Sequence, residues 1–213
     1  MTFMPLMAVL PGSLPAGYFA TITSQRLADG VRPPMFAMIF ACAVFGTWAA
    51  MIMPSYYLLA ISCALGWLLL VLATVDALAF RLPDILTLPL IGLGLAVAAW
   101  APDHDLLGHI VATAIAISLF YAVAASYRRM RHEDGLGLGD VKLAGAAGAW
   151  LGWQALPAVI LLASLIGLVW VGLAVIRRGR QALRERIPFG VALCLAIWVI
   201  WLYGPPEFFG PLF

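Results

Sequence analysis

The chain has 213 residues, of which 64% are hydrophobic and only 10% are charged. Its mean hydropathy of +1.03 excludes a water-soluble domain of this length and indicates an integral membrane protein. A spanning helix needs about 20 apolar residues, so the chain has room for at most about eight or nine spans and no separate soluble domain. The net charge of only +2 gives no sign of a nucleic-acid partner, and the expected surroundings are a lipid bilayer.

The apolar runs predict an all-α, polytopic membrane helix bundle with about eight transmembrane helices. The first run is interrupted by several Pro and Gly residues, and the sixth is short for a hydrocarbon core of about 30 Å. We interpret residues 1–213 as one integral membrane domain, with the first span and a short loop in residues 1–34 and the remaining bundle in residues 35–213. The predicted spans are 3–23, 35–53, 56–75, 85–100, 106–125, 141–155, 157–176 and 188–204.

The distribution of charge gives the predicted orientation. Cytoplasmic loops collect Lys and Arg, and in the eight-span arrangement all 12 basic residues fall on one side of the membrane. Removing or adding a span would divide them between the two sides. We therefore predict that the basic loops are cytoplasmic and that both termini lie outside. The outer segments then contain Asp103, Asp105, Glu207, His104 and His109.

Cysteine and histidine patterns do not predict a metal or cofactor site. Cys42, Cys63 and Cys194 each lie in an apolar run without a C-x-x-C pair, so we expect them to be core residues. His132 begins a segment like H-E-x-x-H, but Leu136 stands where the second histidine is needed. We interpret all three histidines as surface residues, and no G-x-S-x-G motif is present.

Two aspartates, Asp76 and Asp140, differ from the other acidic residues because they stand next to apolar segments. Asp76 follows the apolar run 68–75 and lies at the inner end of the third span. A carboxylate near membrane depth is costly and suggests a function; a second interpretation is that Asp76 reaches the interface and pairs with Arg81. Asp84, just before the fourth span, is most simply interpreted as its N-cap, with a direct role in the site as the alternative.

Asp140 follows glycines at 135, 137 and 139 and opens the sixth span. Glycines remove side chains and let the backbone bend or approach another chain. Residues 144–152 are nearly all small and include a Gly148-x-x-x-Gly152 spacing, which favours close helix packing. Asp140 is therefore predicted to lie on a central helix. A second interpretation is that Asp140 is only the N-cap of that helix.

Asp76 and Asp140 lie on the same inner side of the predicted topology. If they meet, like charges at close range cannot both ionise, so the pair shares a proton. Such a dyad can activate a water for peptide-bond hydrolysis without a metal or a covalent intermediate. Two other classes stay open: a small transporter that moves protons or cations through the same carboxylates, and a non-catalytic membrane subunit of a pilus or secretion machine.

The ordered motifs resemble those of one membrane protease family. Segment 137–143 (GLGDVKL), with Asp76 and segment 82–84 (LPD) upstream, resembles the prepilin leader peptidases, the G-x-G-D aspartic proteases of bacterial membranes. The likeness covers most of the chain and includes segments 16–27, 32–33 and 187–190.

The resemblance implies a specific reaction and a specific set of residues. Asp76 and Asp140 are implied to be catalytic, and the substrate is implied to be a type IV prepilin or pseudopilin precursor. Its leader would be cut after a glycine at the cytoplasmic face of the bacterial inner membrane. The residues implied to shape the site or bind substrate are Gly137, Gly139, Lys142, Pro83 and Asp84.

The sequence departs from the family pattern at two places. Many relatives have a cytoplasmic domain with two C-x-x-C pairs after the first span and methylate the new N-terminus. The corresponding loop here, residues 26–32, contains no cysteine, so we predict that methyltransferase activity is absent. Val191 replaces a proline that is frequent in relatives, and we expect this change to alter packing only.

Overall fold

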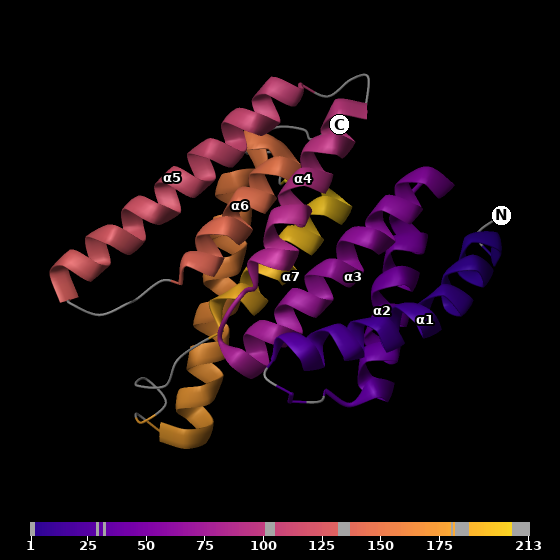
Figure 1. Ribbon diagram of the computed structural model, residues 1–213, viewed down its shortest axis with the longest axis horizontal. Coiled ribbons are helices and arrows are strands. Elements are labelled where there is room, and N and C mark those ends of the chain that lie inside the picture. Colours follow the sequence, from indigo (N-terminus) through magenta and orange to yellow (C-terminus); the bar gives the residue numbers. More distant parts are fainter. Residues whose placement is uncertain are drawn as a thin grey trace. The chain divides into compact units, whose positions relative to one another are not determined.

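The chain is all-helical, as predicted, in a computed structural model that describes residues 3–28, 30–31, 33–100, 105–131, 137–179, 181 and 188–205 (Figure 1). These residues divide between two compact units, Met1–Ala79 and Phe80–Phe213. The helices are α1 (Phe3–Leu27), α2 (Met35–Ile52), α3 (Tyr56–Ala79), α4 (Asp84–Trp100), α5 (Leu106–Arg131), α6 (Leu138–Arg178) and α7 (Phe189–Tyr203).

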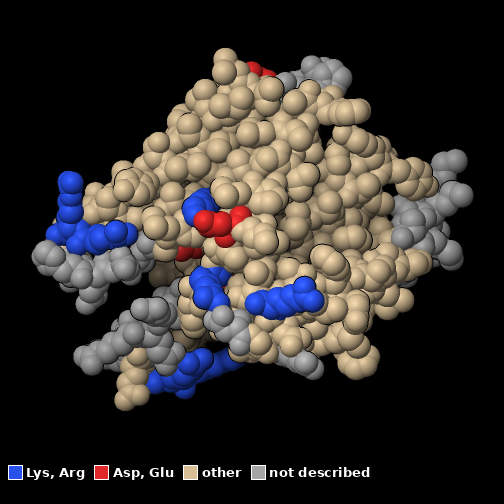
Figure 2. Space-filling model, in the orientation of Figure 1, with Lys and Arg blue, Asp and Glu red and all other residues tan. Residues whose placement is uncertain are grey.

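The helices have the length and composition of membrane spans. Among the described residues, α2, α3, α5 and α6 are long and apolar enough to cross a bilayer, and α4 and α7 are shorter apolar helices. Large apolar side chains such as Phe36, Trp100 and Ile176 are exposed. Figure 2 shows uncharged residues over most of this face, with charged side chains gathered mainly in its lower half. Lipid would cover such a surface. The protein is therefore a polytopic helical membrane protein.

The first unit is an antiparallel packing of α1, α2 and α3. A Cβ on Gly17 would lie 2.5 Å from the Cα of Ile39, so α1 and α2 approach closely because Gly17 has no side chain. Between α2 and α3, the indole Nε1 of Trp67 donates to the carbonyl of Cys42 at 3.2 Å. Cys42 and Cys63 of this unit are buried, as expected, and so is Cys194 of the second unit.

Helix α6 of the second unit is interrupted at Gly152, whose φ of 72° and ψ of 179° lie outside the helical region. Only glycine adopts such angles readily. We expected two separate spans divided at residue 156, next to Pro157. That position was wrong, because the residue that takes the non-helical conformation is the glycine and Pro157 is inside the helix that follows.

The segment of α6 before Gly152 lies antiparallel to α5, and Figure 1 shows the two helices adjacent. A Cβ on Gly145 would meet Ile117 at 2.7 Å, and one on Gly148 would meet backbone atoms of Ala112 at 2.6 Å. The predicted close packing of this small-residue segment is confirmed. Because the helices are antiparallel, the basic C-terminal turn of α5, with Arg128 and Arg129, lies at the same end as the beginning of α6.

At the opposite end of the second unit, residues of α4 and α5 contact α6 just before its interruption. The carbonyls of the last turn before Gly152 have no amide donor within the helix, and Nδ1 of His109 lies 2.9 Å from the carbonyl oxygen of Ala149. His109 is thus a half-buried packing residue of α5, and its interpretation as a surface residue was wrong. Nearby, the buried indole of Trp150 donates to the carbonyl of Leu90 at 2.8 Å.

Candidate active site

Asp76 lies in the last turn of α3 and is only 5% exposed. The apolar residues before it make α3 a long, continuous helix, and Asp76 is buried at its end. A buried carboxylate is costly unless it is partnered or used. Its alternative pairing with Arg81 stays a sequence-based interpretation.

Asp140 is the third residue of α6. The N-cap is Gly137, whose carbonyl accepts from the amides of Asp140 at 3.1 Å and Val141 at 3.4 Å. The interpretation of Asp140 as the N-cap was therefore wrong, because the N-cap is Gly137 and the helix begins at Leu138, three residues earlier than expected. Oδ1 of Asp140 is buried, and the positive end of the helix dipole favours a negative charge in this first turn.

The two glycines of the motif have different surroundings. A Cβ on Gly139 would lie 2.7 Å from the Cβ of Leu82 and within 3.3 Å of its backbone nitrogen and oxygen. A Cβ on Gly137 would lie 3.4 Å from Oδ2 of Asp140. Gly139 thus allows the backbone at Leu82 to pack against α6, whereas Gly137 leaves space beside the Asp140 carboxylate.

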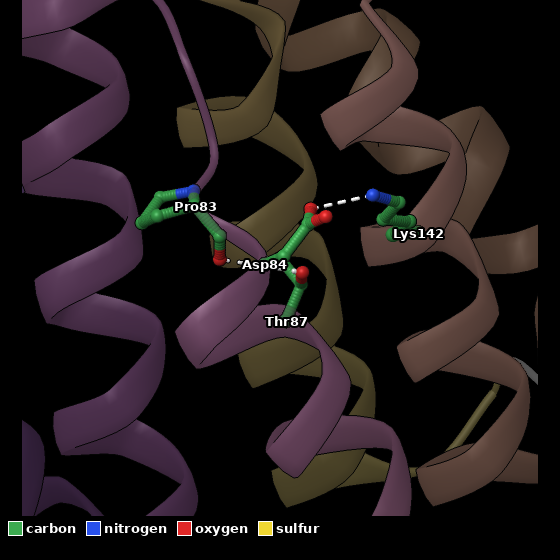
Figure 3. A network of polar contacts seen from close by, with 4 residues as sticks. All are labelled: Pro83, Asp84, Thr87 and Lys142. Atoms are coloured by element: carbon green, nitrogen blue, oxygen red, sulfur yellow. Dashed lines mark hydrogen bonds and ion pairs between the residues drawn. The ribbon is translucent and has the colours of Figure 1, made fainter.

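Asp84 forms an ion pair with Lys142 across α4 and α6 (Figure 3). Oδ1 of Asp84 accepts from Nζ of Lys142 at 2.5 Å, and the two side chains are 60% and 33% exposed. We expected Asp84 to be an N-cap, but it is the first residue of α4. The helix begins one residue earlier than that expectation, and the Asp84 carboxylate is directed at Lys142.

Pro83 occupies the N-cap position of α4 instead. Its carbonyl accepts from the amides of Leu86 at 3.1 Å and Thr87 at 3.2 Å, and from the Thr87 hydroxyl at 3.3 Å. The ring of Pro83 fixes φ, and Thr87 is fully buried. These constraints fix the direction of the first turn of α4 and, with it, Asp84 (Figure 3). The sequence analysis missed Thr87, although a hydroxyl four residues after a proline is a usable signal.

The structure therefore brings five of the predicted site residues together in the second unit: Gly137, Gly139, Asp140, Lys142 and Asp84, with Pro83 adjacent. Asp76 belongs to the first unit, so its meeting with Asp140 stays a prediction. Within the described part of the chain, no group of three or more His, Cys, Asp or Glu side chains could hold a metal ion. His132 and Leu136 lie outside the described residues.

These features define a multi-pass helical membrane protein with one carboxylate buried on a long helix and another in a glycine-flanked first turn. A family model described as the type IV leader peptidase family matches residues 63–172, more than half of the chain, and this region includes both aspartates. The chain belongs to the type IV leader peptidase family. The resemblance recognised in the motifs is confirmed.

Several curated relatives are named prepilin leader peptidase/N-methyltransferase. The relative from Aeromonas salmonicida is 39% identical over 145 residues, covering 66% of this chain and 48% of the relative. A Burkholderia pseudomallei relative is 34% identical over 181 residues, covering 85% and 58%, and one from Pseudomonas aeruginosa is 35% identical over 140 residues. The chain spans about half the length of these relatives. No solved structure matches it.

Proposed function

We propose that the protein is a membrane-embedded aspartic endopeptidase that removes the leader peptide of type IV prepilin-like precursors. The observation that carries this proposal is that the family match over residues 63–172 contains both Asp76 and Asp140, the two aspartates that lie beside apolar segments. The peptidase activity for which the relatives are named supports the same substrate class. The leader would be cut after a glycine.

In the proposed mechanism, Asp76 and Asp140 form a dyad that shares one proton. The ionised member takes a proton from a water, which attacks the scissile carbonyl carbon. The protonated member donates its proton to the developing oxyanion, which gives a tetrahedral diol. The member that took the water's proton then delivers it to the amide nitrogen as the peptide bond breaks, and the other member takes a proton from the diol, so the dyad again holds one proton. Because coupled carboxylates titrate as a pair, the two roles belong to the dyad rather than to fixed residues.

The connectivity of the chain supports a meeting of the two aspartates. Leu82 packs on Gly139, directly before Asp140. Leu82 is only six positions after Asp76 in the chain, so the chain allows at most about 20 Å between their Cα atoms. The connection from Asp76 to Leu82 is therefore short enough to be compatible with close contact between Asp76 and Asp140.

We infer that the chain crosses the membrane eight times, with both termini outside. An uninterrupted helix as long as the 41-residue α6 would measure about 60 Å, twice the hydrocarbon core of about 30 Å. A reversal at Gly152 turns α6 into two crossings, and the aspartates then lie at the cytoplasmic face of a bacterial inner membrane. A cysteine at Asp105, in a background without native cysteines, should react with an impermeant thiol reagent from outside. A cysteine at Gly179 should not, and the opposite pattern would contradict this orientation.

The same proposal includes leader cleavage without methyl transfer. The connection between α1 and α2 covers residues 28–34 and contains no cysteine, whereas the relatives are named for both activities. Purified protein supplied with a methyl donor should release the leader and leave the new N-terminus unmethylated. A methylated product would refute this part.

The decisive test of the function uses purified protein and candidate prepilins in a buffer with a strong chelator. We expect a new N-terminus, identified by sequencing, immediately after a glycine of the leader. Intact precursors in every pairing, together with proton-coupled or cation-coupled uptake in vesicles, would favour the transporter instead.

A further inference from the structure

We propose that the contacts between the beginnings of α4 and α6 position Asp140 for catalysis. This α4–α6 junction consists of Leu82 and Asp84 on one side and Gly139 and Lys142 on the other. The inference rests on the proposed peptidase function and adds positioning residues to it. Lys142 and Asp84 act through Asp140 and do not contact the scissile bond.

The junction has two contacts, one made by a residue before Asp140 in the sequence and one by a residue after it. Leu82 packs on Gly139, so tightly that a Cβ there would lie 2.7 Å from the Leu82 Cβ. Lys142 donates to Asp84, 58 residues earlier in the chain. Residues three apart share a helix face, so Gly139 and Lys142 present one face of α6 to α4. Asp140 lies about 100° further round the helix.

The exposure of the ion pair indicates that it contributes to the positions of the two helices rather than to the stability of the fold. Its side chains are 60% and 33% exposed, and ion pairs in water contribute little to stability. Both partners, however, lie near the beginning of their helices: Asp84 is the first residue of α4, and Lys142, the fifth residue of α6, directly follows its first turn. A contact at that place restrains how the first turn of α6 rotates and shifts.

The first turn of a helix needs such restraint. Its amide groups lack acceptors within the helix, and helix ends fray. No side chain caps the N-terminus of α6, where Gly137 is the N-cap. A catalytic carboxylate misplaced by about 1 Å can lose about a hundredfold in rate. Tertiary contacts on both sides of Asp140 supply the rigidity that the glycine-rich sequence lacks.

A charge-reversal cycle on the full-length protein tests the ion pair. We expect Asp84→Asn and Lys142→Met each to lower kcat for prepilin cleavage by about tenfold, with KM changed less than about twofold. The double variant should be no slower than either single variant, and Asp84→Lys combined with Lys142→Asp should recover most of kcat. Arg177→Met, which removes an exposed charge at the far end of α6, is the matched control and should keep the wild-type rate.

A second pair of variants tests the packing contact. Gly139→Ala should lower kcat by at least about tenfold, since the new methyl group meets Leu82. Leu82→Gly removes the nearest atom, so the Gly139→Ala/Leu82→Gly protein should regain part of the lost kcat. Thermal unfolding of each variant, measured without substrate, shows whether the folded protein or only its rate has changed.

The outcomes separate this inference from the proposed function. If the wild type cleaves and Asp140→Asn does not, but the Asp84 and Lys142 effects are absent, additive or confined to KM, the positioning role is wrong and the peptidase stands. A loss in the single variants without recovery in the charge-reversed protein also overturns it. If the wild type cleaves no prepilin, the proposed function fails and the positioning role fails with it.

Discussion

The two aspartates are held in opposite ways. Asp76 lies in the last turn of a 24-residue helix and is buried, so its backbone belongs to a long, continuous element. Asp140 lies in the first turn of a segment that begins after glycines and ends at the Gly152 interruption. Its position depends on contacts with another helix. The difference suggests that substitutions away from the dyad affect Asp140 more readily than Asp76.

The largest expected effect follows from removing either carboxyl group. Asp76→Asn and Asp140→Asn keep size and hydrogen-bonding capacity but remove the titrating group, so each should lower leader cleavage by at least about a thousandfold. The assay is a gel shift of a co-expressed prepilin, with protein levels checked by immunoblot. Asp105→Asn, an exposed carboxylate before α5, is the control and should process normally. Unchanged cleavage in either site variant would refute the dyad.

The interruption of α6 should be sensitive to a single methyl group. Gly152 has a positive φ that alanine adopts only with strain, so Gly152→Ala should destabilise the fold by about 1–3 kcal/mol. Gly172→Ala is the matched control in the same helix, because a Cβ there meets no atom within 4 Å. It should be neutral or slightly stabilising. Thermal unfolding in detergent measures both, and equal effects would argue against the described kink.

A smaller effect is expected at the beginning of α4. Thr87→Val keeps the shape of a fully buried side chain but removes the hydroxyl that donates to the Pro83 carbonyl. Because that carbonyl keeps its two amide donors, the loss should be only about 0.5–1.5 kcal/mol. Cleavage should fall slightly, through Asp84. A loss as large as that of Asp84→Asn would mean that Thr87 has a more direct role.

The helices were predictable because apolar runs report burial in lipid directly. The ranges of α2, α4 and α7 differ from the predicted spans by at most one residue at either end. Helix boundaries near polar segments were less predictable: α5 extends to Arg131 beyond its apolar run, since arginine is a good helix former. The break in α6 could not be assigned to Gly152 rather than to the neighbouring Pro157 without its backbone angles.

The site was predictable residue by residue but not in its contacts. Asp76 and Asp140 stand out because carboxylates beside apolar runs are rare. The pairing of Asp84 with Lys142 joins positions 58 residues apart, and no local pattern reports such a contact. Likewise, the glycine motif indicates that something approaches Gly139 closely, but only the fold identifies Leu82 as the neighbour.

The most direct test of the account is whether Asp76 and Asp140 meet. Cysteines placed at both positions, in a protein without Cys42, Cys63 and Cys194, should cross-link within one chain on oxidation or with the shortest bifunctional thiol reagent. The pair Asp76→Cys and Asp105→Cys is the control and should not cross-link. The cross-linked peptide is identified by mass spectrometry. Efficient cross-linking of positions 76 and 140 is the predicted result, and its absence in a protein that still inserts would contradict the shared-proton dyad.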